Sequence, residues 1–486
     1  MPKTLTRRQV TGLLATPALL QSAQQKQPNL LLVLSDDHSR PHAGCFGNPV
    51  IQTPVIDRFA SQGMKMDRMF TAAPQCVPSR SALLTGRSPV ANRMGRFASP
   101  MPPEIKTLPE LLRAKNYYSG VCRRYFHLDG VINPTPLTRR IYEEHEMKTW
   151  AKRIDFLHTG GNRDATPKVM NEFLDKAGQQ PFFLWINFSD PHHPWERNAI
   201  AKPHDPAKIP LPPHLPDLPG VRDDLARYYD EISRADEELG MVLKTLETRG
   251  LADNTLVIFM GDNGHAFPHG KGSLYDPGLN VPCIARWPGK IAAGTDSHHL
   301  LSGEDITPTF LEAAGIAASK EMSGRSFLPM LRSTPGYQPR KHIFAARLPH
   351  GNSNYTAQTK ASTFDLSRCA RSASHKLIWN YTPYQEYSPV DSANGPGWRE
   401  MVAAHEAGKL SPAIDKAYFT RPRPVVELFD LDKDPSELNN LAGQTEHAKV
   451  EEELKVALQE KMVADYDFLP PPFIEAAPGP NAVIVK

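Results

Sequence analysis

Polar side chains follow at once after three apolar runs in this sequence of 486 residues. Asp36 and Asp37 follow NLLLVLS, His192 lies just after PFFLWINF, and Asp262 and Asn263 follow TLVIFM. Carboxylate and amide oxygens are the ligands that calcium and magnesium prefer. A single acidic pair after a strand is usually a solvated turn. A second pair after another apolar run instead predicts one shared cation site.

The five cysteines do not form a disulfide framework for a chain of this length, and no CxxC metal pattern occurs. They are Cys45, Cys76, Cys122, Cys283 and Cys369. Their odd number leaves at least one cysteine without an intrachain partner. Cys76 opens the stretch CVPSRSALLTGR and is the candidate for a chemical role.

The elements that position these residues are strands buried on both faces, because continuous apolar runs of this length are typical of a parallel sheet. Residues 281–287 (VPCIARW) form a fourth such run. In open α/β sheets, ligands bind outside the carboxyl ends of the strands. The acids, the amide and the histidine are therefore expected at one edge of one sheet.

Helices fill the gaps between the strands. Residues 107–110 (TLPE) read as a capping box, and residues 223–250 carry apolar positions at amphipathic spacing. Residues 305–314 form another helix, which Gly315 ends. We therefore predict an α/β fold with a large, mostly parallel sheet sandwiched by helices. From about residue 350, short runs such as HKLIWN between turn-rich loops predict a smaller C-terminal α+β domain.

Residues 1–23 resemble an export signal, because three basic residues precede an apolar stretch that is too short to span a bilayer. The alternative is a disordered basic tail. No other segment is apolar enough for a membrane span. The net charge is +3, and residues 1–23 carry three basic and no acidic side chains, so the mature chain is nearly neutral. A nearly neutral chain has no long-range electrostatic field that would attract nucleic acid. We expect an exported, periplasmic protein with domains at 28–350 and 351–486.

The stretch from Cys76 matches the signature C-x-P-S-R…L-T-G-R and in this respect resembles the type I sulfatases of the alkaline-phosphatase-like superfamily. The resemblance implies that a formylglycine-generating enzyme converts Cys76 into formylglycine (3-oxoalanine), whose aldehyde hydrates to a diol. One hydroxyl attacks sulfur and expels the alcohol. Proton loss from the other then releases sulfate and restores the aldehyde. The resemblance also implies that Asp36, Asp37, Asp262 and Asn263 bind calcium, or else magnesium, together with residue 76.

The resemblance assigns further roles. Arg80 would anchor the diol oxygen or the sulfate. His192, in a P-H-x-P motif, would protonate the leaving alcohol, which is general acid catalysis. Lys271 would bind sulfate, although a loop lysine is ordinarily solvated. His265 either lines the site and contacts substrate, or only satisfies loop backbone, and the same alternatives apply to His269.

His127 matches the family histidine that deprotonates the second hydroxyl during sulfate release. The sequence departs from the family pattern here, because the lysine expected two residues earlier is Tyr125. Arg124 or Arg123 would replace its charge at the substrate, and the sequence leaves the choice between them open.

The stretches DNGHAFPHGKGSLYDPG and RSASHKLIWN resemble the N-sulfoglucosamine sulfohydrolases and their bacterial relatives, which implies a sulfated carbohydrate substrate carrying O- or N-sulfate. One alternative within the superfamily is a phosphate or phosphonate ester hydrolase, because both substrate groups are tetrahedral oxyanions. Another is a non-catalytic glycan-binding relative, although such proteins usually lack the nucleophile or a metal ligand, and this chain keeps them.

Overall fold

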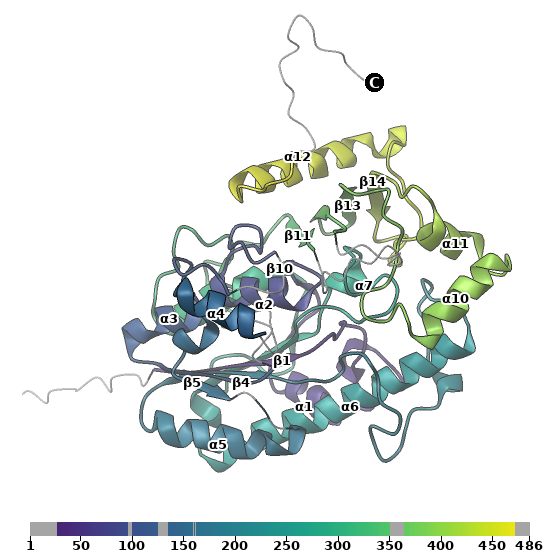
Figure 1. The fold of residues 1–486 in the computed structure, drawn as a ribbon. Coiled ribbons are helices and arrows are strands. Elements are labelled where there is room, and N and C mark those ends of the chain that lie inside the picture. Colours follow the sequence, from purple (N-terminus) through teal and green to yellow (C-terminus); the bar gives the residue numbers. More distant parts are fainter. Residues whose placement is uncertain are drawn as a thin grey trace, which may run out of the picture.

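The computed structural model describes residues 27–95, 100–124, 135–158, 160, 162–349 and 364–471. Within these residues, an eight-stranded sheet lies between two layers of helices, and a four-stranded sheet lies beneath helix α12 (Figure 1). The large sheet has the spatial order β5 (Phe156–His158), β4 (Tyr118–Arg123), β6 (Phe182–Asn187), β1 (Asn29–Ser35), β7 (Thr255–Gly261), β8 (Cys283–Arg286), β2 (Met64–Met66) and β9 (Thr295–Ser297). The predicted fold class is confirmed.

Strand β1 lies inside the sheet and pairs in parallel with β6 on one side and β7 on the other. All seven of its residues are buried, as expected for a strand covered on both faces. Three of the predicted runs therefore form adjacent parallel strands. The fourth run forms β8, which is shorter than predicted and antiparallel to β7. The chain returns from β7 through a loop and the short helix α7 (Asp276–Leu279), without a helical crossover over the sheet.

Helices cover both faces of the large sheet. Leu31 and Val33 of β1 pack on one side with Phe173 and Leu239, while Leu30 and its even-numbered neighbours face the other side. The lower layer in Figure 1 contains α1 (Pro54–Ser61), α5 (Thr166–Ala177) and α6 (Pro219–Thr248). The opposite face holds α2 (Cys76–Thr85), α3 (Leu108–Leu112), α8 (Ile306–Ala313) and α9 (Leu328–Leu331), and α4 (Pro136–Glu144) is a further, exposed helix. The predicted capping box opens α3, and the other two predicted helices correspond to α6 and α8.

The smaller sheet is antiparallel. Its strands are β11 (Ile343–Arg347), β12 (Ser367–Arg371), β13 (His375–Asn380) and β14 (Val426–Asp430), and β3 (Met69–Phe70) pairs separately with β10 (Leu301–Ser302). Helix α12 (Ala448–Ala464) packs on one face of the small sheet through Leu454 and Leu458. The other face packs on the large domain at Phe70 and Leu279. Helices α10 (Pro396–Glu406) and α11 (Pro412–Phe419) follow β13 along the chain. This arrangement brings the segment between β13 and α10 close to the large sheet.

Two predicted features lie outside the described residues, namely the export signal at 1–23 and His127 with its neighbour Tyr125. Across the part of the chain that is described, none of the helices combines the length and the apolar character that crossing a bilayer requires.

Candidate active site

The carboxyl ends of β1 and β7 bring the two predicted pairs together. Ser35 pairs with Gly261, so the next residues of both strands leave the sheet side by side. The backbone N–H of Asp37 donates to Asp262 Oδ1 at 3.0 Å, and Asn263 Nδ2 donates to Asp37 Oδ1 at 2.8 Å. Asp36, Asp37, Asp262 and Asn263 are fully buried, and we refer to these four residues as the strand-end cluster.

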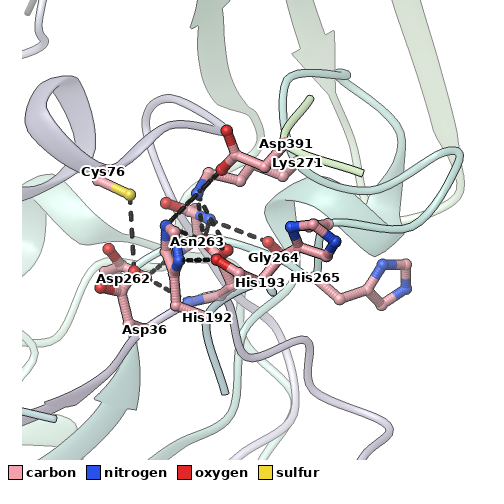
Figure 2. Close-up of polar contacts among 12 residues, drawn as sticks. Asp36, Cys76, His192, His193, Asp262, Asn263, Gly264, His265, Lys271 and Asp391 are labelled. Carbon is pink, nitrogen blue, oxygen red and sulfur yellow. Dashed lines mark hydrogen bonds and ion pairs between the residues drawn. The ribbon is translucent and has the colours of Figure 1, made fainter. Parts of the chain in front are cut away.

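Cys76 is the first residue of helix α2 and points at this cluster (Figure 2). Its thiol lies 3.6 Å from Asp36 Oδ1. Gln75 fixes the start of the helix, because its side chain donates to the carbonyl of Leu348 at 2.7 Å and accepts from the N–H of Leu348 at 3.1 Å. Burial raises the pKa of the Cys76 thiol well above its usual value, and although Lys271 opposes this, Asp36 adds to it. An unmodified thiol here is therefore a poor nucleophile at neutral pH.

Arg80 lies one turn further along α2 and is fully buried among the carboxylates. Its Nε and Nη2 contact Asp262 Oδ2 at 2.9 and 2.8 Å, and Nη2 also lies 3.2 Å from Asp36 Oδ2. Its Nη1 donates to Asn187 Oδ1 at the end of β6 at 2.9 Å. Arg80 thus joins the ends of three strands and offsets the charge of two buried carboxylates.

Lys271 and His192 lie on another side of the cluster, together with Asp391 (Figure 2). The Lys271 ammonium lies 2.8 Å from Asp37 Oδ1, 2.7 Å from Asp391 Oδ2 and 3.2 Å from His192 Nε2. Lys271 is buried, whereas the Asp391 side chain is 29% exposed and so stands at the solvent side of the lysine. Sequence reasoning missed Asp391, since its segment SPVDSANGPG carries only the composition of a turn.

The hydrogen bonds of His192 determine where its proton lies. Nδ1 is 2.5 Å from the carbonyl of His193, and a carbonyl oxygen can only accept, so Nδ1 carries the hydrogen. Nε2 is then an acceptor towards the Lys271 ammonium. Burial lowers the pKa of His192 to about 4, and the charge of Lys271 adds to this effect, while Asp36 opposes it. In this arrangement His192 is neutral at pH 7.

The structure distinguishes the two arginines that sequence left open. Arg124 Nη1 lies 2.6 Å from Asp36 Oδ2 and therefore belongs to the site. Arg123 points towards helix α6 and donates from Nη1 to Glu238 Oε1 at 2.7 Å. The position at the cluster is therefore held by Arg124.

His265 lies in a layer of buried histidines beside the cluster. Its ring centroid is 5.4 Å from that of His42 and 6.4 Å from that of His214, which in turn stacks on His269 at 5.5 Å. His265 Nδ1 accepts from the N–H of Phe267, which is the contact expected of a histidine that satisfies loop backbone. Burial lowers the pKa of all four imidazoles.

The residues of the strand-end cluster fit a hard divalent cation. The side-chain oxygen of Asn263 is buried and has no hydrogen-bond partner within the described residues. Burial raises the pKa of Asp37 to about 7, and burial together with Asp36 raises that of Asp262 to about 6. Ligand atoms of Asp36, Asp37, Cys76 and His192 also lie within 4.8 Å of one another. The three carboxylates and the amide oxygen are hard donors, which favours calcium or magnesium over softer ions.

The parallel sheet, the buried acids at its carboxyl edge and the residue at the start of α2 together define a hydrolase of tetrahedral oxyanion esters. Comparison with protein families narrows this class. Residues 28–316 match the family described as Sulfatase, and residues 264–417 match the family described as N-sulphoglucosamine sulphohydrolase, C-terminal. The chain therefore belongs to the sulfatase family and is a hydrolase of sulfate esters.

Two sequence relatives agree with this assignment, and two solved structures share the fold. An ulvan-active sulfatase of Formosa agariphila is 29% identical over 473 residues, covering 90% of this chain and 75% of the relative. Human N-sulphoglucosamine sulphohydrolase is 27% identical over 481 residues, covering 88% of each chain. A protein solved in complex with D-glucosamine-2-N,6-O-disulfate shares the fold with a TM-score of 0.68 at 20% identity, over 92% of this chain and 100% of that one. The phosphonate monoester hydrolase of Agrobacterium radiobacter shares the fold with a TM-score of 0.66 at 18% identity, over 90% of this chain and 95% of that one.

Proposed function

We propose that this protein removes sulfate from a sulfated glycan by means of a formylglycine made from Cys76 and a bound calcium ion. The observation that carries the proposal is the convergence of Cys76, the strand-end cluster and Lys271 in one buried site. The names of the relatives support the choice of a glycan, because they refer to ulvan and to N-sulphoglucosamine.

The cation would be held by Asp36, Asp37, Asp262 and Asn263, with magnesium as the alternative ion. When bound, it would lower the pKa of a hydroxyl nucleophile and polarise the sulfate oxygens. Arg80 would keep the carboxylates in position, since it contacts two of them.

Formylglycine at position 76 would supply a hydrated aldehyde whose hydroxyl replaces the weakly acidic thiol as nucleophile. Helix α2 would contribute its N-terminal amides, which stabilise negative charge at its first residue. Lys271 would bind the sulfate, and Arg124 would offset negative charge beside Asp36.

His192 would protonate the leaving alcohol from Nε2. In the described arrangement the Lys271 charge lowers the pKa of this imidazole. A sulfate placed against Lys271 would offset that charge and so favour a proton on Nε2. Substrate binding would thereby prepare the general acid. For His127 we propose the role of a base during sulfate release. His265 remains a proposed substrate contact, although its observed contacts are those of a backbone support.

We also propose that residues 1–23 direct export to the periplasm and that a formylglycine-generating enzyme modifies the chain. The proposed division into a catalytic domain at 28–350 and a smaller one at 351–486 has one qualification. Strand β11 belongs to the smaller sheet although it lies before residue 350.

The proposal is tested by mass spectrometry of the peptide that contains residue 76, coupled to activity. Conversion of CH₂SH to an aldehyde should lower its mass by about 18 Da, the change that the diol nucleophile requires. Protein produced without a modifying enzyme, and Cys76→Ala, should be nearly inactive on sulfated oligosaccharides. Full activity of either protein would refute the mechanism.

A second candidate is a phosphonate or phosphate ester hydrolase, which is favoured by the shared fold of the Agrobacterium enzyme. Aryl sulfate, aryl phosphate and aryl phosphonate should be compared at equal concentration with the converted enzyme. Faster turnover of a phosphorus ester would select this second candidate.

A further inference from the structure

Two neighbouring hollows lie along helix α12, apart from the active-site residues. The larger has a volume of about 780 Å³ and includes the end of α12 at Lys461. The smaller has a volume of about 480 Å³ and includes the start of α12 at Val450. Arg340 lines both hollows, so they adjoin, and no residue of the strand-end cluster lines either one. We refer to the two hollows together as the basic groove.

Cationic side chains are concentrated in the basic groove. The larger hollow is lined by Arg87, Arg93, Lys320, Arg325, Arg340 and Lys461, against the acids Glu304, Glu321 and Asp465. The smaller is lined by Arg68, Arg340, Lys341 and the histidines His298, His299, His342 and His375, against Glu453. Among the described residues, Lys320, Arg325, Arg68 and Lys341 form no ion pair, and all except the half-buried Arg68 are exposed. These four charges are available to an anionic ligand.

Tyr466 adds an aromatic surface at the rim of the larger hollow. Its side chain is 93% exposed, and its φ of 53° lies in the left-handed region that glycine usually occupies after a helix end. This conformation is unfavourable for a residue that carries a bulky side chain. A ring as exposed as this gains little from packing. It does present a large aromatic surface with a polar tip, a kind of residue that is common in binding sites.

We propose that the basic groove binds a segment of a sulfated polysaccharide, with sulfate groups against its unpaired cations and a sugar ring against Tyr466. This inference rests on the proposed function, because the polymer would be a substrate or a product of the active site. Binding at a second place would hold the polymer near the enzyme between catalytic events and raise its effective concentration.

The charge pattern favours a sulfated glycan over nucleic acid. Glu321 and Glu453 line the two hollows beside the cations with side chains 73% and 62% exposed, so their carboxylates can accept hydrogen bonds from sugar hydroxyls. Double-stranded DNA carries a charge about every 1.7 Å, so the same carboxylates would repel its backbone. Sulfates spaced along a saccharide can instead meet the cations one at a time.

The test measures binding of dextran sulfate, with unsulfated dextran as the reference polymer, by calorimetry at low ionic strength. The variant Lys320→Ser/Arg325→Ser should bind dextran sulfate about tenfold more weakly, because two exposed ionic contacts together contribute on the order of 1.4 kcal/mol. The control Lys176→Ser/Lys244→Ser removes two exposed lysines from α5 and α6, on the far side of the large sheet from α12 (Figure 1), and should bind like the wild type. Tyr466→Ala should also weaken binding, and all variants should keep wild-type turnover of 4-nitrophenyl sulfate.

Equal affinity of the groove variant and the control variant would overturn the proposal. So would a DNA duplex that binds as tightly as dextran sulfate and depends on the same two residues. The proposed function can fail separately. If the converted enzyme desulfates no glycan while dextran sulfate binding still depends on Lys320 and Arg325, the groove is supported as a site for sulfated polymers and only the proposed substrate is overturned.

Discussion

Lowering the pH from 7 to 5 should remove the stability that the buried histidines beside the active site contribute to the folded protein. Burial lowers the pKa of His214 to about 4, whereas an imidazole in an unfolded chain titrates near 6.5. Below pH 6.5 this histidine therefore binds more protons in the unfolded chain, and its contribution to stability is lost as the pH falls from 6.5 towards 4. For His214 alone the loss between pH 7 and pH 5 is about 2 kcal/mol, since a pKa difference of one unit corresponds to about 1.4 kcal/mol.

The variant His214→Phe isolates this contribution. Phenylalanine keeps a planar ring beside His269, where the native rings lie 5.5 Å apart at 12°, and removes Nε2, which has no hydrogen-bond partner within the described residues. Urea unfolding at pH 7, 6 and 5 should show the wild type losing about 2 kcal/mol more than the variant over this range. His145→Asn, at an exposed position, should follow the wild type. Parallel pH profiles for wild type and His214→Phe would refute the reasoning.

Three further predictions concern the active site. Chelation should abolish activity, because it removes the cation that offsets the charge of the strand-end cluster, and added calcium should restore activity. Full turnover by protein shown to be metal-free would contradict the cation site. His192→Ala should slow sugar sulfates ~10²–10⁴-fold more than aryl sulfates, because phenolates leave without a proton. Equal losses on the two substrate classes would exclude the general-acid role. Asp391→Asn should let inorganic sulfate inhibit the enzyme several-fold more strongly, because the Asp391 carboxylate, 2.7 Å from the Lys271 ammonium, repels an incoming anion. Inhibition by sulfate that is unchanged or weaker in the variant would contradict this role of Asp391.

The core of the site can be predicted from sequence because its residues stand at the ends of long apolar strands. A run such as NLLLVLS can only be buried on both faces, and the parallel pairing of β1 with β7 places the residues after Ser35 and Gly261 together. The last buried apolar residue of each strand thus marks where the polar ligands begin. Cys76 can also be found from sequence, because the sulfatase signature that begins with it is one contiguous stretch.

Features created by tertiary packing escape this reasoning. Strand β4 reads YSGVCR, without a continuous apolar run, yet it lies inside the large sheet between β5 and β6. A side chain at Gly120 would come within 2.5 Å of Phe173, so this glycine is required by a neighbour on another element. Asp391 reaches Lys271 only because the segment after β13 packs beside the large sheet. Its own sequence resembles any surface turn.

The burial of helix α2 has a consequence for how active enzyme is produced. All ten residues of the helix are buried, and Cys76 is only 2% exposed. If Cys76 is converted as proposed, the converting enzyme cannot reach it in the folded protein and would have to act before the chain folds. A molecule that folds first stays unconverted for as long as it remains folded. Under that proposal, the active fraction of a preparation would depend on the rate of conversion relative to the rate of folding, and it should increase when the converting enzyme is made more abundant.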